Sequence, residues 1–449
     1  MNRIFNAPTD EKQEKKILTG IIAVFSLLLV LLAWDNYGIW FDELFTLKLI
    51  QLPYLQTITA TAQDVHPPLY YLCVKLFTQI FGVFHVDTII ASKLFSVTCL
   101  VLLMILTTRK LLKRYGYNTA LMFLILFFGT RVIMYAVEIR MYALAMLFVT
   151  MSFLYVNEIR YEDTRHNWIC FTVYSILAAY THYHAAISVS LFYFYLLYRT
   201  VKNGTWKKWL ISFAVIVFSY LPWLFVILAQ LKHVNEGWGG NLTFRDFAMF
   251  IAFPFYTNNI PLTAVIGLLC VCLVIADWRK GKDVLIKLGE FSPVYVGTIG
   301  LTAAVLAHKF FTGKYMLPVW VVFWVSLAVA YSKSKYRKQI LAVFLLLNTV
   351  TYVISWQKED ADRKGYYVIR NLVEANAGTA FHCDSTIASI IDYYGFAQNN
   401  GQVDSNLDEN DTSGYYIVYT DLSYSSDLSK LKTVQTIVLG GASVTILHG

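Results

Sequence analysis

Charged residues are scarce in this chain: they make up 15% of its 449 residues, whereas 57% of the residues are hydrophobic. Soluble domains carry a larger charged share and a smaller apolar share. A single water-soluble core cannot bury this much apolar surface, so the shortage of charge excludes an ordinary soluble protein. We therefore expect an integral membrane protein with lipid around most of the chain, in agreement with a mean hydropathy of +0.52.

Cysteine is also rare, with six residues whose spacing fits neither a zinc site nor a disulfide framework. The chain lacks an internal repeat, a P-loop, a dinucleotide-binding glycine pattern and a block of like charges. It also lacks a small-residue cleavage pattern after Trp34, so we expect the first apolar run to be a retained anchor and not a cleaved signal peptide. We therefore do not expect a zinc-binding or disulfide-rich protein, a repeat protein, or a P-loop or dinucleotide-binding enzyme.

The net charge of +8 is the one feature that suggests nucleic acid as a partner. The lysines and arginines, however, cluster in short loops between apolar runs, which is the pattern of cytoplasmic loops in membrane proteins. Lys15-Lys16 precedes the first apolar run, and Arg109–Arg114 follows the run at residues 88–108. We expect no nucleic acid partner, a cytoplasmic N-terminus and a multi-pass location in the cell (inner or plasma) membrane.

These basic loops and the apolar runs between them predict about eleven membrane crossings, with the N-terminus inside and the C-terminal part outside. The outer ends of the runs collect acidic residues, histidines and a few basic residues beside hydrocarbon, where ionisable groups are costly and usually functional. The expected spans are residues 17–34, 88–108, 119–137, 143–157, 168–181, 185–198, 209–229, 262–277, 291–307, 316–332 and 339–356.

Residues 35–87 are expected to form an outer loop that holds the catalytic residues. Leu44–Ala62 is interrupted by polar residues and a proline, so we expect one amphipathic helix on the membrane interface. Leu69–Phe84 is apolar but short for a crossing. Because Arg109–Arg114 should be cytoplasmic, we expect Leu69–Phe84 to lie flat on the outer face as a second juxtamembrane helix.

Residues 357–449 change character, because Asp, Asn, Ser and Gly rise and no apolar run is long enough to span. Residues 415–420 and 434–439 alternate as strands do, and residues 364–376 have a helical pattern. We therefore expect two domains: a transmembrane domain over residues 1–356 and a small extracytoplasmic α/β domain over residues 357–449.

Asp42 and Glu43 are the first chemical feature of the outer loop. A carboxylate held against an acceptor hydroxyl serves as general base in sugar transfer, and a neighbouring carboxylate orients the acceptor or binds a metal. The alternative is structural, with Asp42 as the N-cap of the helix that follows. The position beside the membrane, ahead of a histidine-proline-proline element, favours catalysis.

Asp64, His66, Pro67 and Pro68 are the second feature. Two prolines favour a stiff, extended entry into the following helix. Such a corner would hold Asp64 and His66 in a defined place, where His66 binds a phosphate or joins Asp64 on a divalent metal. The alternative is a turn that contains a histidine without a function.

Three further features stand at outer ends of the expected spans. Arg140 is suited to neutralise a lipid phosphate, because its guanidinium matches phosphate oxygens, or it extends to the lipid headgroups without a specific role. Lys314 and Tyr315 present the same choice. His182 and His184 either assist a metal or the acceptor, or are structural residues of the interface.

The order of these motifs resembles that of membrane glycosyltransferases of the GT-C fold. An early outer Asp-Glu is followed by Pro-Pro-Leu-Tyr-Tyr at residues 67–71, Arg-Met-Tyr-Ala-Leu at 140–144 and Lys-Tyr-Met-Leu-Pro at 314–318. Over residues 17–335 the chain is most similar to the protein O-mannosyltransferase and lipid A aminoarabinose transferase group, the bacterial enzymes related to glycosyltransferase family 39. Aminoarabinose transferases carry Glu-Lys before the two prolines, whereas this chain has Val65-His66, so that pair's role does not transfer directly.

The resemblance implies a sugar donor carried on a polyprenyl phosphate in the bilayer, and it implies that Asp42 matches the catalytic acid-pair position. We therefore expect an inverting hexosyl- or pentosyltransferase of the cell envelope, with Asp42 as general base, Glu43 beside it and an unknown glycan, lipid or protein acceptor. A flippase or transporter of lipid-linked sugars is the alternative, but it should show paired repeats and polar residues at mid-membrane depth. The expected donor-phosphate ligands are His66, Arg140, Tyr142, Lys314 and Tyr315, and the candidate ligands of a divalent metal are Asp64, His66, His182 and His184.

Overall fold

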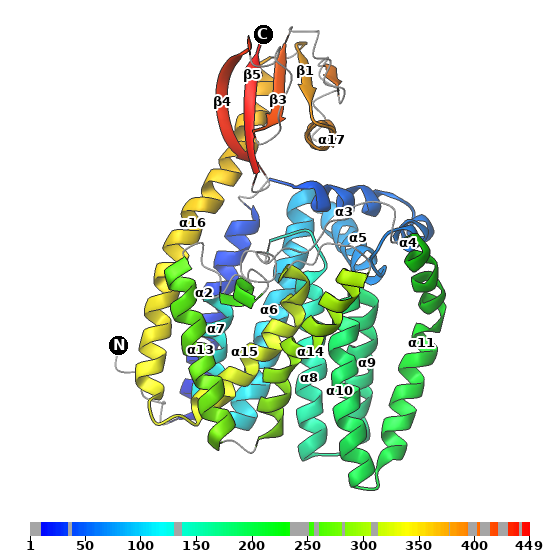
Figure 1. Cartoon of the computed structure of the whole chain (residues 1–449), viewed down its shortest axis with the longest axis vertical. Helices are drawn as coiled ribbons and strands as arrows, with labels where there is room; N and C mark the ends of the chain where they lie inside the picture. The colour runs from blue at the N-terminus through cyan, green and yellow to red at the C-terminus, as the bar shows by residue number, and fades with distance from the viewer. Residues whose placement is uncertain are drawn as a thin grey trace. The chain divides into compact units, whose positions relative to one another are not determined.

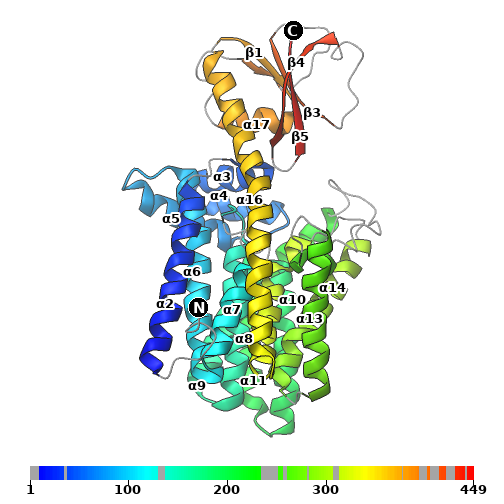
Figure 2. The same ribbon diagram turned by 90° about the vertical axis from the view of Figure 1, so that its left-hand side faces the viewer.

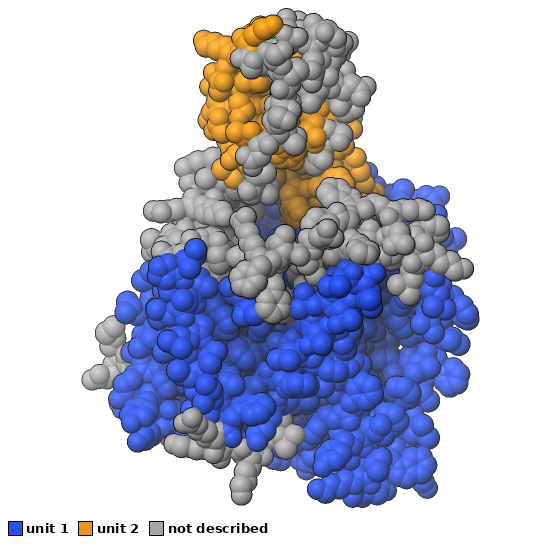
Figure 3. Space-filling view, viewed as in Figure 1, with its two compact units in different colours: residues 1–33, 49–352 blue, residues 34–48, 353–449 orange. Residues whose placement is uncertain are grey.

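The computed structural model of the chain separates into two compact units. Unit 1 comprises Met1–Ala33 and Leu49–Tyr352, and unit 2 comprises Trp34–Lys48 and Val353–Gly449 (Figure 3). This division by contacts assigns Trp34–Lys48 to the second unit, and the predicted domain boundary at residue 356 remains a prediction. The described residues are 10–34, 38–129, 137–233, 251–255, 260–280, 283–306, 313–376, 378–393, 402–404, 414–420, 430–439 and 442–449.

Unit 1 is a bundle of helices, and each of the expected spanning segments overlaps a helix (Figures 1 and 2). Two short 3-10 turns, η2 (Phe253–Phe255) and η3 (Gly313–Met316), lie between its later helices. The helices are α2 (Glu11–Trp34), α4 (Tyr54–Gln63), α5 (Leu69–Gly82), α6 (Thr88–Tyr115), α7 (Tyr117–Phe128), α8 (Tyr142–Tyr161), α9 (Arg165–Thr181), α10 (Tyr183–Lys202), α11 (Trp206–His233), α13 (Ile260–Lys280), α14 (Val284–Leu306) and α15 (Leu317–Ser332).

Length and hydropathy identify five membrane spans among the described helices: Glu11–Trp34, Thr88–Tyr115, Tyr142–Tyr161, Trp206–Gln230 and Gly313–Ser332. This confirms a multi-pass α-helical membrane protein. Shorter apolar helices accompany these spans, and the count of about eleven crossings stays a prediction. In the most apolar stretches of α8 and α15, 89% of the residues are buried, against 11% in α11. The first two are therefore central and α11 is peripheral.

Local signals in the sequence explain where several helices begin. The Asp87 side chain accepts hydrogen bonds from the backbone of Ile89 and Ile90 and so caps α6, and the Thr164 hydroxyl does the same for α9. Gly116 separates α6 from α7 with a φ of 83°, a conformation that glycine adopts without steric cost. Polar caps and one glycine thus divide a mostly apolar sequence into helices.

The juxtamembrane region corrects one expectation. Leu44–Ala62 was expected to be one amphipathic helix, but the chain breaks at Pro53 into α3 (Phe41–Gln51) and α4. Proline cannot donate the next helical hydrogen bond, which accounts for the break. The Lys75 ammonium of α5 donates to the carbonyl of Ile50 at 2.7 Å and satisfies one of the carbonyls that the end of α3 leaves open.

Helices α4 and α5 lie at the end of the bundle where α9 ends and α10 begins (Figures 1 and 2). Helix α4 contacts α11, and α5 contacts α6 and α9. These contacts bring the turn between α4 and α5 close to the turn between α9 and α10. That Leu69–Phe84 lies flat on the outer face of the membrane stays a prediction.

Unit 2 contains the expected small α/β structure. The single 39-residue helix α16 (Arg337–Ala375) enters it from Val353 onward. The five-stranded sheet has the order β2-β1-β3-β5-β4, with β1 parallel to β2 and β3 and the other pairs antiparallel. Its elements are β1 (Ala380–Cys383), α17 (Ser385–Tyr393), β2 (Gln402–Asp404), β3 (Tyr415–Tyr419), β4 (Lys432–Leu439) and β5 (Ala442–His448).

Candidate functional site

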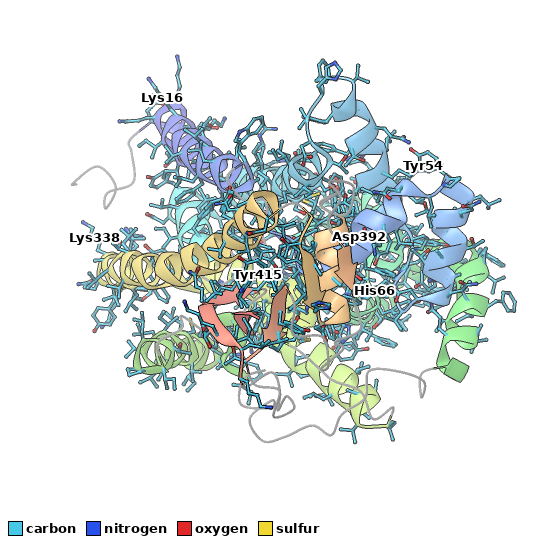
Figure 4. The ribbon with its side chains drawn as sticks, turned by 90° about the horizontal axis from the view of Figure 1, so that it is seen from above. Lys16, Tyr54, His66, Lys338, Asp392 and Tyr415 are labelled. Atoms are coloured by element: carbon cyan, nitrogen blue, oxygen red, sulfur yellow. The ribbon has the colours of Figure 1, made fainter. Side chains whose placement is uncertain are left out.

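The turn between α4 and α5 carries a carboxylate–imidazole pair. His66 Nδ1 lies 3.0 Å from Asp64 Oδ2, and the two side chains are 14% and 24% exposed. Asp64 is the C-cap of α4 and Pro68 is the N-cap of α5, so helix ends fix both sides of this turn. Figure 4 labels His66 and Tyr54, the first residue of α4.

The charge state of Asp64 follows from this pairing. Burial alone would raise the pKa of Asp64, but the hydrogen bond from His66 and the charges of His66 and Arg140 offset it, so the pKa lies below its ordinary value. Asp64 is therefore an anion at neutral pH. The same hydrogen bond orients the imidazole of His66.

His182 forms the turn between α9 and α10. It is 3% exposed, and its Nδ1 accepts the backbone N–H of His184 at 3.1 Å, which caps α10. An Nδ1 that accepts a hydrogen bond belongs to the neutral ring with its proton on Nε2. Burial, followed by the charges of His184, His66 and Arg140, holds the pKa of His182 well below its ordinary value.

His184 is neutral for the same physical reason. Burial, with a smaller contribution from the charge of His66, lowers the pKa of His184 to about 4. His182 and His184 thus present two uncharged rings, and the positive charge of this region comes from other side chains. This arrangement differs from a cluster of histidinium ions.

Rings from four separate segments meet around His182. Its ring centroid lies 6.0 Å from that of His66, 5.9 Å from Tyr142 and 6.0 Å from Tyr315. Tyr315 also lies 5.5 Å from the ring of His184. The segments are the α4–α5 turn, the start of α8, the α9–α10 turn and η3, so residues far apart in sequence form one cluster.

Two cationic side chains border this cluster. Arg140 is buried directly before α8, and its charge acts on both Asp64 and His182. Lys314 Nζ lies 6.0 Å from the centre of the Tyr142 ring. We call Asp64, His66, Arg140, Tyr142, His182, His184, Lys314 and Tyr315 the histidine cluster.

The histidine cluster brings together all the sequence-predicted phosphate and metal residues. It lies at one end of unit 1 and combines the buried Arg140 and the half-buried Lys314 with neutral rings and one carboxylate. Such a setting suits a phosphate, whose oxygens accept hydrogen bonds and need positive charge nearby. The N-terminus of α8, beside Arg140, adds positive potential of the same sign.

Asp42 and Glu43 belong to unit 2 and are described separately. Trp40 is the N-cap of α3, because its carbonyl accepts the N–H groups of Glu43 and Leu44. The Glu43 carboxylate accepts the Trp40 N–H in return at 3.1 Å, which is one half of a capping box. Trp40 and Glu43 therefore cap α3, whereas the structural alternative predicted Asp42 as the cap.

Asp42 lies in the first turn of α3 and is half-buried. A carboxylate that is partly accessible can reach a substrate hydroxyl, as a general base must. The catalytic assignment of Asp42 remains a prediction.

The metal prediction finds little support in the geometry. Across the described ranges, no group of three or more His, Cys, Asp or Glu side chains is arranged to hold a metal ion. Asp64 is bonded to His66 Nδ1, and His182 Nδ1 is taken by a backbone N–H, so two of the expected donors face other partners.

The opposite end of the bundle carries a belt of ion pairs between helices. Arg114 of α6 donates to Glu158 of α8 at 2.6 Å and to Glu162 at 2.8 Å. Arg160 of α8 pairs with Asp283, which precedes α14, at 3.1 Å. These residues, together with Lys110 and Lys333, fasten α6, α8, α14 and α15 to one another where the basic loops lie.

Sequence reasoning assigned no role to four residues: Lys93, Ser96, Tyr183 and Gln230. Lys93 is 1% exposed although it lies in the apolar run of α6, and Ser96, one turn later, donates to the Glu138 carbonyl at 2.6 Å. Gln230 and Tyr183 join the two turns of the cluster. Lys93 could have been singled out from the sequence, because a lysine inside an apolar span is unusual. The contacts of Gln230 could not, because they depend on the packing of helices far apart in the sequence.

No known sequence family and no curated protein matches the chain. The fold does have solved relatives. The crystal structure of ArnT from Cupriavidus metallidurans bound to undecaprenyl phosphate matches with a TM-score of 0.52 and 10% identity, over 96% of this chain and 97% of that one. The apo state of the same protein matches with a TM-score of 0.51, 10% identity and the same coverage. The likeness confirms the expected GT-C fold, and at this identity it shows the fold alone.

Proposed function

We propose that this membrane protein is a glycosyltransferase that moves a sugar, with inversion, from a polyprenyl-phosphate donor to an acceptor outside the cytoplasm. The observation that carries the proposal is the histidine cluster, where buried Arg140 and half-buried Lys314 border neutral rings at one end of the bundle. Support comes from the likeness in fold to ArnT, which has been solved with undecaprenyl phosphate.

In the proposed reaction, the acceptor hydroxyl attacks the anomeric carbon of the sugar from the face opposite the phosphate. Asp42 takes the hydroxyl proton as the new glycosidic bond forms. The bond between the anomeric carbon and the phosphate oxygen breaks, and the polyprenyl phosphate leaves with the electron pair. One bond forms and one breaks on opposite faces of the same carbon, which accounts for the inversion.

The departing phosphate gains negative charge, so the site must supply positive charge where the oxygen leaves. Arg140 offers a planar set of donors for two oxygens, and Lys314 offers a mobile ammonium beside Tyr142. His66, paired with Asp64, donates from Nε2 when its ring is protonated. His182 and His184 lie beside these cations as uncharged rings and so do not repel them.

The side of the membrane that the site faces is inferred from the distribution of charged residues. The belt of ion pairs and basic loops lies at the end of the bundle opposite the histidine cluster (Figure 1). Basic residues mark the cytoplasmic side. We therefore assign the histidine cluster to the outer face, where a donor lipid enters sideways from the bilayer and the acceptor arrives from outside.

The flippase alternative is less well supported. A flippase must open both ends of its helical bundle in turn to pass a polar headgroup. The belt joins α6 to α8 through Glu158, whose side chain is largely buried with Arg114 and Lys110. Breaking such a buried pair costs about 3–5 kcal/mol, which opposes opening at that end.

Binding of undecaprenyl phosphate to purified protein tests the phosphate site. Arg140→Gln keeps a polar, hydrogen-bonding side chain and removes the charge, so affinity should fall ~10- to 100-fold, the loss typical of a charge-assisted hydrogen bond. Arg109→Gln, at the exposed end of α6, is the matched control and should bind as the wild type does. Equal affinity in all three proteins would remove the phosphate from the histidine cluster.

A further inference from the structure

Gln230, near the C-terminal end of α11, uses both ends of its side-chain amide. Nε2 donates to the carbonyl oxygens of Thr61 and Ala62, each at 3.3 Å. Oε1 accepts the hydroxyl of Tyr183 at 2.5 Å. An amide side chain is both donor and acceptor, so this single residue connects α4 to the α9–α10 turn.

The two segments that Gln230 connects are those that carry the pairs of the histidine cluster. Ala62 ends the last turn of α4 just before Asp64 and His66. Tyr183 stands between His182 and His184. Gln230 itself has none of the ring or charge contacts given above for the cluster, so it acts on the cluster only through these two backbone segments.

The direction of the side chains in the α9–α10 turn explains this division of roles. The rings of His182 and His184 face Tyr315, whereas the Tyr183 hydroxyl faces α11, where it accepts the Trp223 indole N–H at 3.2 Å. Helix α11 therefore holds the α9–α10 turn through Tyr183, while His182 and His184 line the histidine cluster. The end of α4 is fixed by the same helix (Figure 1).

The Thr61 carbonyl also accepts the backbone N–H of Asp64 at 3.2 Å, so Gln230 and the C-cap of α4 share this acceptor. The bond to the Ala62 carbonyl adds a donor at the end of α4, where helical carbonyls lack partners in the helix. Without Gln230, the last turn of α4 would keep the Asp64 bond but lose its connection to α11, and it would open more often. Asp64, the C-cap of α4, would move with that turn. The position of the last turn of α4 therefore sets the distance between the rings of His66 and His182.

We propose that Gln230 is a positioning residue for the donor phosphate: it sets the Asp64–His66 pair against the α9–α10 turn and so determines donor affinity without touching the donor. This inference rests on the proposed function and adds to it the residue that fixes the geometry of the phosphate site. Gln230 positions the α4–α5 turn through the end of α4, and it positions the α9–α10 turn through the hydroxyl of Tyr183.

Gln230→Glu separates the two bonds, because a carboxylate still accepts the Tyr183 hydroxyl but repels the carbonyls of Thr61 and Ala62. Gln79→Glu is the matched control, since Gln79 also accepts a tyrosine hydroxyl, from Tyr54 at 2.7 Å, on the exposed rim of α4 and α5. For donor turnover, Gln230→Glu should raise KM ~10-fold with kcat changed less than ~2-fold, because donor binding loses its preset geometry. Gln79→Glu should match the wild type.

A double-mutant cycle with His66→Ala shows whether Gln230 acts through the histidine. If it does, His66→Ala should raise KM much less in the Gln230→Glu background than in the wild type, by a coupling of ~5-fold or more. Independent, multiplicative effects on KM would overturn the proposal. An unchanged KM in Gln230→Glu would overturn it as well.

Hydrogen exchange of the protein without any donor separates this inference from the proposed function. Gln230→Glu should raise the exchange rate of the backbone amides of residues 62–66 by ~5-fold or more, because the local turn opens more often. If exchange rises but the wild type neither binds undecaprenyl phosphate nor consumes a donor, the proposed function fails, and what stands is that Gln230 holds the end of α4 in place. If the wild type turns over the donor and exchange is unchanged, the role of Gln230 is refuted.

Discussion

His66 Nδ1 lies 3.0 Å from Oδ2 of Asp64 in the turn between α4 and α5. The pair places an imidazole against a carboxylate whose pKa is lowered, beside the buried Arg140. This relationship connects the sequence element His-Pro-Pro to the chemistry of the proposed phosphate site.

Asp64→Asn should lower stability at neutral pH and leave it nearly unchanged in strong acid. The pKa of Asp64 is lowered in the folded protein, so its contribution is present above the ordinary value of ~3.9 and is lost as the pH falls through the lower folded pKa. The expected loss at pH 7 is about 1–2 kcal/mol, the size of one charge-assisted hydrogen bond. Thermal unfolding of the two proteins from pH 7 to pH 3 measures it, and an equal difference at all pH values would contradict it.

The buried histidines predict a second effect of acid at higher pH. The pKa of His184 is about 4 in the folded protein, below the ordinary histidine value, so the unfolded chain binds this proton first. Stability is therefore complete above a pH of ~6.5 and falls as the pH drops toward 4. His184→Gln removes the titrating group and should flatten this part of the Tm profile. A profile as steep as that of the wild type would show that His184 is not the group responsible.

The ion-pair belt predicts unequal effects of two neighbouring acids. Glu158→Gln leaves Arg114 and Lys110 without their buried partner and should cost about 3–5 kcal/mol of stability. Glu162→Gln is the matched control, because Glu162 is 55% exposed and pairs with the same arginine; it should cost less than about 1 kcal/mol. Thermal stability in detergent gives both values. Equal losses would mean that burial does not govern this network.

Donor turnover by the surviving folded fraction of Glu158→Gln bears on the flippase alternative. If the belt only holds the bundle together, turnover per folded molecule should stay within ~2-fold of the wild type, because the change lies far from the proposed chemistry. Movement of lipid-linked sugar across liposome leaflets that appears or rises in this variant would instead favour the flippase.

Much of the fold was predictable because hydropathy and basic loops are read directly from the sequence. Each expected span overlaps a helix, and the expected strands at 415–420 and 434–439 coincide with β3 and β4. The misses have local causes. Pro53 divided the expected helix at Leu44–Ala62, and α16 continues through residue 356 although the sequence becomes polar there.

The candidate site was predictable in its residues but not in its network. The residue types and their outer positions selected His66, Arg140 and Lys314 one by one. The contact of the His66 and His182 rings, and the bond between Gln230 and the end of α4, join segments over a hundred residues apart. Such contacts depend on how helices pack, which no local pattern encodes.

The central claim is that Asp42 is the base in a sugar transfer from a polyprenyl phosphate. The most direct test gives purified protein a radiolabelled polyprenyl-phosphate sugar and compares wild type, Asp42→Asn and Asp87→Asn. Asp87 is the matched control, because it caps α6 and asparagine serves equally well as an N-cap. We expect the wild type and Asp87→Asn to release the sugar to acceptor or water, and folded Asp42→Asn to be slower by ~1,000-fold or more because it lacks the general base. Equal release by all three proteins would contradict the central claim.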